Sequence, residues 1–212
     1  MNAPAIANPL PLFPLGSVLF PDGQLNLQIF EVRYLDLIGR CYKEGTPFGV
    51  VALQQGHEVR RRDPAQPTGD GFANEVFADV GTLAHIVAFS TPQAGLMRIR
   101  CQGGARFRIR TRQQLKHGLW VAEVDPLPAD QPTPIPPDLQ PIAHALGQFI
   151  EQQGQHPDFP VTAPYQLNDC GWVANRWCDL LALPPSQKQS LLQLDSPLLR
   201  LELVGDLLVQ QG

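Results

Sequence analysis

The chain has 212 residues, of which 43% are hydrophobic and 17% charged, and its formal net charge is -4 at pH 7. This balance is typical of a globular protein: it is too apolar for a disordered chain, and the chain is long enough to bury a core without disulfides. The net negative charge argues against general attraction to nucleic acid or anionic membranes, which requires clustered positive charge.

The first elements predicted along the chain are short strands followed by one helix. Residues 10–30 alternate apolar and polar residues between prolines and glycines, a pattern that favours strands. Val32, Leu35 and Ile38 then recur at helical spacing, and Gly45 ends the run. We therefore expect an amphipathic helix directly after the strands.

The middle of the chain predicts a β-rich region. Residues 48–53 are apolar and β-branched, which indicates a buried strand, and residues 54–74 predict a long polar loop. Residues 75–125 predict a series of strands separated by turn segments such as TPQAG and QGG. Such a meander can form a barrel or a sandwich.

The last part of the chain predicts helices. Residues 126–137 are too rich in proline for a helix or a central strand, and they mark the best internal boundary. Helices are predicted beyond it, with Asp169 and Ser196 as N-caps, over residues 138–153, 169–183, 186–194 and 197–210. The expected fold class is α+β, with a β-rich domain at residues 1–130 and a helical domain at 131–212.

The sequence carries no pattern that predicts catalysis. The three lysines lie outside any phosphate-binding loop, the five histidines lack metal-ligand spacing, and the serines lack the context of an activated nucleophile. The four cysteines show no paired spacing and are expected to be reduced thiols. We therefore expect no catalytic residues, no metal ligands and no cofactor. With no signal peptide and no long apolar run, we also expect a cytoplasmic protein without a membrane partner.

The most pointed pattern is a set of arginines at a spacing of two, which would share one face of a strand. The set comprises Arg98, Arg100, Arg106, Arg108, Arg110 and Arg112. One interpretation is a basic platform for RNA, and the other is a solvated face paired with Glu123 and Asp125 of the next strand. We favour the second. These arginines and the loop residues Arg60, Arg61 and Arg62 are the candidate binding residues.

Several stretches of the sequence resemble the amino-terminal domain of Lon proteases. They are LPLFPLGSVLFP at 10–21, LQIFEVRYLDLI at 27–38, FGVVAL at 48–53, GTLAHIVAF at 81–89, GGARFRI at 103–109 and WVANRWCDLLALPPSQKQSLLQLDSPLLRLELV near the carboxyl end. The resemblance covers nearly the whole chain and keeps the order of the family.

The resemblance implies a PUA-like β-barrel with the helix at about residues 31–44 packed on it, followed by a C-terminal helical bundle. It implies a module that recognises unfolded or specific protein or peptide partners, while the ATPase and peptidase domains of Lon proteases are missing from this chain. The expected function is thus non-catalytic protein binding, and the alternative is an RNA-binding PUA-like module that uses the arginine face. Arg33 is expected to pair with a local acid and not to bind a ligand.

Overall fold

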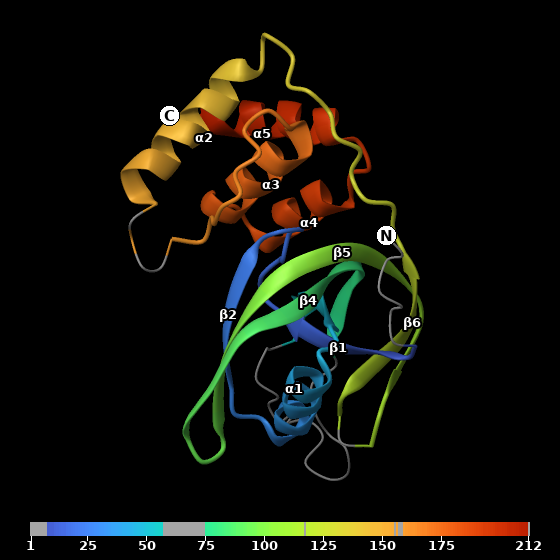
Figure 1. Ribbon diagram of the computed structural model, residues 1–212. Coiled ribbons are helices and arrows are strands. Elements are labelled where there is room, and N and C mark those ends of the chain that lie inside the picture. Colours follow the sequence, from blue (N-terminus) through green and yellow to red (C-terminus); the bar gives the residue numbers. More distant parts are fainter. Residues whose placement is uncertain (1–7, 57–74, 117, 155, 157–158, 212) are drawn as a thin grey trace. The chain divides into compact units, whose positions relative to one another are not determined.

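The computed structural model describes residues 8–56, 75–116, 118–154, 156 and 159–211 (Figure 1). The chain divides into two compact units, residues 1–127 and 128–212. Within the described residues, the first unit holds the strands and one helix, and the second holds the remaining helices. The α+β class predicted from the sequence is confirmed.

The first unit contains these elements: β1 (Leu10–Leu15), β2 (Gln24–Ile29), α1 (Val32–Glu44), β3 (Phe48–Gln55), β4 (Val76–Gln93), β5 (Leu96–Gln114) and β6 (Trp120–Pro126). The predicted short strands, the helix after residue 30 and the buried strand at 48–53 are confirmed. Gly45 follows α1 with a φ of 65°, in the left-handed region that favours glycine, as the sequence predicted.

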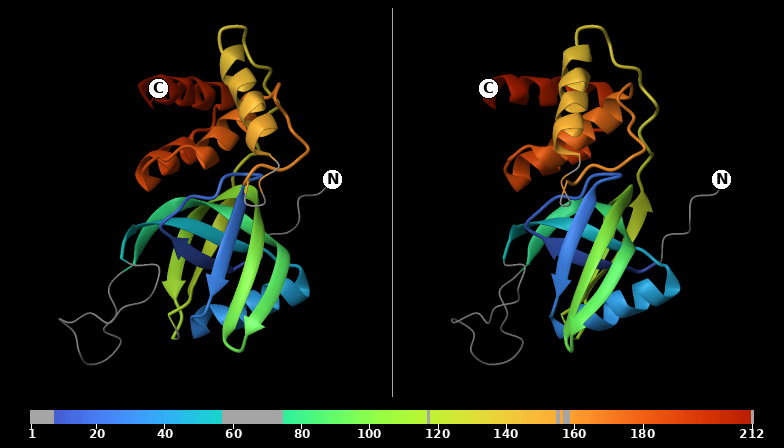
Figure 2. Two further views of the ribbon diagram at one scale, coloured as in Figure 1. Left: turned by 90° about the vertical axis from the view of Figure 1, so that its left-hand side faces the viewer. Right: turned by 60° about the vertical axis from the view of Figure 1, so that its left-hand side comes forward.

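The strands pair in the order β2-β5-β4-β3-β1-β6, and β6 also pairs with β5. Five strands (β5, β4, β3, β1 and β6) therefore form a closed circuit of pairings. The sixth strand, β2, lies outside this circuit and pairs with the first half of β5 (Figure 2). The β1–β3 pair is parallel and the other pairs are antiparallel.

Gly103 explains why the turn predicted at QGG does not form. The Gly103 amide donates to the Gly23 carbonyl at 2.8 Å, and its carbonyl accepts from the Asp22 amide at 2.9 Å. A Cβ atom at this position would overlap the carbonyl oxygen of Phe20. Gly103 therefore lies inside the long strand β5, at a point where the backbone of residues 20–23 approaches closely, and the predicted turn is wrong.

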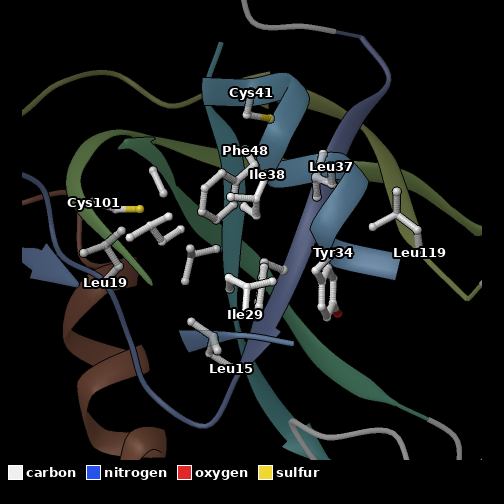
Figure 3. Close-up of a cluster of buried hydrophobic side chains, with 14 residues drawn as sticks. Leu15, Leu19, Ile29, Tyr34, Leu37, Ile38, Cys41, Phe48, Cys101 and Leu119 are labelled. Carbon is white, nitrogen blue, oxygen red and sulfur yellow. The ribbon is translucent and has the colours of Figure 1, made fainter. Parts of the chain in front are cut away.

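An apolar cluster lies between α1 and the sheet (Figure 3). The buried face of α1 contributes Tyr34, Leu37, Ile38 and Cys41 to it. The ring of Tyr34 stacks on Phe13 of β1 with 3.9 Å between the ring centroids. The buried residues of α1 keep helical spacing, but the predicted stripe is wrong at Val32, which is 77% exposed.

The second unit contains α2 (Gln140–Gln153), α3 (Cys170–Leu180), α4 (Pro185–Gln193) and α5 (Pro197–Gln211). Both predicted N-caps are confirmed. The Asp169 carboxylate accepts from the Trp172 amide at 2.8 Å, and the Ser196 hydroxyl accepts from the Leu199 amide at 3.3 Å. No helix of the described part of the chain is long and apolar enough to span a membrane.

Arg200 of α5 ties the second unit together. Its side chain is 1% exposed, and its guanidinium forms an ion pair with Asp130 in the proline-rich segment. It also donates to the amide oxygen of Asn175 and to the carbonyls of Leu191 and Leu194. One side chain therefore satisfies acceptors from α3, from the segment around α4 and from the chain that precedes α2.

Candidate functional site

The six arginines predicted to share one face of β5 do not all do so. Arg106 is 5% exposed, whereas the other five are exposed, namely Arg98, Arg100, Arg108, Arg110 and Arg112. The β4–β5 pairing is irregular between Thr82 and Ala84, opposite Arg106 and Gly103, and the alternation of buried and exposed residues shifts there. The prediction of a single six-arginine face is therefore wrong at Arg106.

Acidic residues pair with part of this arginine face. Arg110 forms an ion pair with Asp125 of β6 at 3.2 Å, which confirms one of the two predicted acidic partners. Arg112 instead lies 3.6 Å from Asp79 of β4 and donates to the Phe77 carbonyl at 3.2 Å. The predicted basic spot at residues 60–62 lies outside the described residues.

The cysteines are buried, and their environment suppresses thiol reactivity. Burial raises the pKa of Cys101 and of Cys178 to about 12, and it also raises the pKa of Cys41 and Cys170. Because the thiolate is the nucleophile, these groups are unreactive near neutral pH. Among the described residues, no group of three or more His, Cys, Asp or Glu is placed to hold a metal ion.

Arg33 fixes the start of α1 against the sheet. Its guanidinium donates to Glu31 at 3.0 Å, to Glu75 at 3.0 Å and to the Gly118 carbonyl at 3.0 Å. Glu75 also accepts from the Trp120 indole at 2.6 Å. The expected local pairing with an acid is confirmed. Sequence reasoning missed Glu75 because no local pattern links residues so far apart in the chain.

One edge of β2 is open. Within the described residues, β5 is the only strand that pairs with β2, in a register that runs from Gln24 opposite Gln102 to Ile29 opposite Met97. Along β2, Asn26 and Gln28 are exposed while the leucines between and beside them are half-buried. The other edge of β2 therefore pairs with no described strand.

A pocket with a volume of about 240 Å³, lined by both polar and apolar residues, lies beside this open edge. Its lining includes residues 26–31 together with buried Phe13 and Leu15 from β1 and buried Tyr34 from α1. Figure 3 shows Leu15, Ile29 and Tyr34 near one another in the apolar cluster. Phe30, which also lines the pocket, is 54% exposed. The pocket and the open edge together form the surface that we call the β2 seam.

A second apolar surface lies along the outer side of α1. The ring of Tyr42 is half-exposed and stacks on Phe89 of β4 with 4.4 Å between the centroids. A pocket of about 280 Å³ is lined by Leu35 of α1 and, among other residues, by Leu96 and Met97 of β5. Exposed apolar groups of this kind often mark interaction surfaces.

Comparison of the sequence with models of known protein families identifies the family of this chain. The model of the ATP-dependent protease La (LON) substrate-binding domain matches residues 9–210. The chain belongs to this family. The resemblance to Lon proteases inferred from the sequence is therefore confirmed, and the matched residues span both units of the chain.

Two solved structures of Lon amino-terminal domains are similar to the chain. A Lon N-terminal domain protein from Xanthomonas campestris has a TM-score of 0.70 and 32% identity, with 92% of this chain and 95% of that chain covered. The N-terminal domain of a Mycobacterium avium complex Lon protease has a TM-score of 0.58 and 14% identity, covering 93% and 96% respectively, and shares the fold. No curated protein matches the chain.

Proposed function

We propose that this Lon-family domain is a non-catalytic module that binds unfolded or extended protein segments at the β2 seam. The observation that carries the proposal is the pocket lined by buried Phe13, Ile29 and Tyr34 with exposed Phe30 beside it. Pockets that combine aromatic and aliphatic side chains with a few polar groups are typical anchor points of ligands and protein partners. The family description, a substrate-binding domain, supports a function in binding.

The finer architecture belongs to the same proposal. We infer that the closed circuit of strand pairings is the PUA-like β-barrel of the family, with α1 packed on it, and that the helices after it form a bundle. We place the boundary between the two subdomains at residues 130 and 131, three residues beyond the division between the compact units after Leu127. The partner is a protein or peptide, and neither catalysis nor a cofactor is required.

The first experiment measures binding of a permanently unfolded protein. Fluorescently labelled, reduced and carboxymethylated lactalbumin is titrated with the full chain, and native lactalbumin is the control ligand. Phe30→Asp removes an aromatic ring from the lining of the pocket and adds a charge there, and it is expected to weaken binding at least about tenfold, or about 1.4 kcal/mol. Val87→Asp is the matched control, because Val87 is 55% exposed against 54% for Phe30 and lies on β4, outside the lining of the β2 seam.

Two results would count against this proposal. If the unfolded protein does not bind the wild-type chain at high concentration, the function is wrong. If it binds and both aspartate variants weaken it equally, the location at the β2 seam is wrong.

The RNA-binding alternative is tested in parallel. Exposed Arg98, Arg100 and Arg108 favour it, whereas the ion pairs of Arg110 and Arg112 reduce the free positive charge of the face. An RNA-binding protein would retain single-stranded RNA at low salt and release it steeply as salt increases. If RNA is retained in a salt-sensitive way and Arg108→Glu abolishes this retention, RNA binding would replace protein binding as the leading function.

A further inference from the structure

The open edge of β2 presents backbone groups at alternate residues. Along an antiparallel pair, every second residue turns its N–H and C=O groups toward the partner strand. The Gly103 amide donates to the Gly23 carbonyl, so the odd-numbered residues of β2 turn toward β5. Asn26 and Gln28 therefore turn their backbone N–H and C=O groups toward the open edge.

Within the part of the chain that the structure describes, β2 lacks three features that normally prevent strand pairing. Edge strands of soluble proteins are usually blocked by charged side chains, prolines or bulges. The sequence of β2 is QLNLQI, with no charge and no proline, and its register with β5 is continuous. On β1, whose residues line the other side of the pocket, Pro14 has no amide donor. An incoming strand would therefore pair with β2.

The pocket lies where such a strand would place its side chains. Successive side chains of a strand point to opposite faces, so alternate residues of an added strand lie on the same side as Leu25, Leu27 and Ile29. An apolar cavity of about 150 Å³ can hold a benzene molecule. A pocket of about 240 Å³ therefore has room for a leucine or aromatic side chain, which could lie against the apolar part of the lining formed by Phe13, Leu15 and Ile29.

We propose that an extended segment of an unfolded polypeptide binds by adding a strand to the open edge of β2, with one large apolar side chain in the pocket beside Ile29 and Tyr34. The inference rests on the proposed function and adds its binding mode. Backbone pairing supplies affinity with little dependence on sequence, and the pocket selects an apolar residue. Folded proteins are poor ligands because their own strands are already paired.

A proline at position 26 tests the backbone contact. Asn26→Pro removes an outward amide without removing a hydrogen bond to β5, and Asn26→Ala is the matched control that keeps the amide. The probe is a labelled peptide of alternating threonine and leucine with a central phenylalanine and a lysine at each end. We expect Asn26→Pro to weaken binding of the peptide at least about tenfold and Asn26→Ala to weaken it less than about twofold.

N-methylated peptides keep the inference testable if Asn26→Pro does not fold. Two versions of the probe carry N-methyl groups at alternate residues, in one frame or the other. A peptide that adds a strand turns every second amide toward β2, so one frame abolishes binding to the wild-type chain and the other preserves it. An equal effect of the two frames would overturn strand addition.

The remaining outcomes separate this inference from the proposed function. If unfolded lactalbumin binds wild type and Asn26→Pro equally, strand addition is wrong while protein binding stands. If it does not bind wild type, both are wrong. If Asn26→Pro changes only the molar mass of the free protein in light scattering, the edge joins two copies of the chain and the inference is overturned.

Discussion

The guanidinium of Arg33 donates to the carboxylate of Glu75 at 3.0 Å, and both side chains are 4% exposed. Breaking a buried ion pair typically costs about 3–5 kcal/mol, and the cost of removing Glu75 should lie at the lower end because Glu31 still pairs with Arg33. Glu75→Ala should lower the free energy of unfolding by about this amount in urea denaturation. Asp79→Ala, which removes the exposed partner of Arg112, should change it by less than about 0.5 kcal/mol. Similar small effects of both would contradict the proposed role of the pair.

The elements that the sequence predicted best are those with local periodicity. The strands before residue 30, the helix α1 and the helices of the second unit each show an apolar pattern or a cap within a few neighbouring residues. At Gly103 the local signal indicated a turn, because the sequence does not show which backbone approaches the glycine. Arg106 was predicted on the wrong face for a related reason, because the sequence pattern does not reveal irregularities in strand pairing.

The candidate site could not be predicted, for a similar physical reason. The open edge of β2 is defined by which strands pair with β5, and those pairings join residues far apart in the chain. The alternation of Leu25, Asn26, Leu27 and Gln28 identified a strand but carried no information on its second neighbour. The contact of Arg33 with Glu75 is hidden for the same reason.

Two glycine-to-alanine substitutions should change the stability of the protein in opposite directions. Gly39 lies in α1, and a Cβ atom there would meet only Met97 at 3.9 Å, an ordinary contact. Gly39→Ala should therefore stabilise the protein by about 0.5–1 kcal/mol. Gly103→Ala should destabilise it by more than about 2 kcal/mol, because its Cβ would overlap the Phe20 carbonyl. Thermal unfolding followed by circular dichroism measures both, and stabilisation by Gly103→Ala would contradict the tight approach.

Arg200→Lys should destabilise the second unit although it keeps the charge. A lysine cannot reproduce the planar set of donors that reaches Asp130, Asn175 and the two carbonyls. The expected loss is at least about 2 kcal/mol, since hydrogen bonds to charged groups contribute about 1.5–3 kcal/mol each. Arg108→Lys, at an exposed position, is the control and should be nearly neutral. Faster hydrogen exchange of the backbone amides of α3 and α5 in Arg200→Lys would show that the loss of stability lies in the second unit.

His85 should contribute to loss of stability in mild acid. Burial lowers the pKa of His85 below its ordinary value of 6.5 in the folded protein. As the pH falls, the unfolded chain therefore takes up the proton first, and the free energy of unfolding decreases below about pH 6.5. His85→Gln should reduce the difference between unfolding free energies measured at neutral and at mildly acidic pH. An unchanged difference, with exposed His144→Gln as the control for loss of an imidazole, would exclude this contribution.

The cysteines should be inert in the native protein. Because burial raises the pKa of Cys101 and Cys178 to about 12 and also raises that of Cys41 and Cys170, little thiolate forms at pH 8. Ellman's reagent should release almost no colour from the native chain within minutes. After unfolding in guanidinium chloride, all four cysteines should react. Rapid native reaction of one thiol would show that its surroundings open easily.

The pairing of β1 with β6 determines how long β1 must wait for one of its partner strands during synthesis of the chain. Leu10 lies opposite Ala122, so the first strand to leave the ribosome cannot find this neighbour until almost the whole first unit has been synthesised. At a translation rate of about 5–20 residues per second, that wait is on the order of ten seconds. During it, the apolar stretch LPLFPL remains without one of its two partners. A domain that we propose to bind unfolded chains would thus itself remain partly unfolded, and accessible to chaperones, during its synthesis.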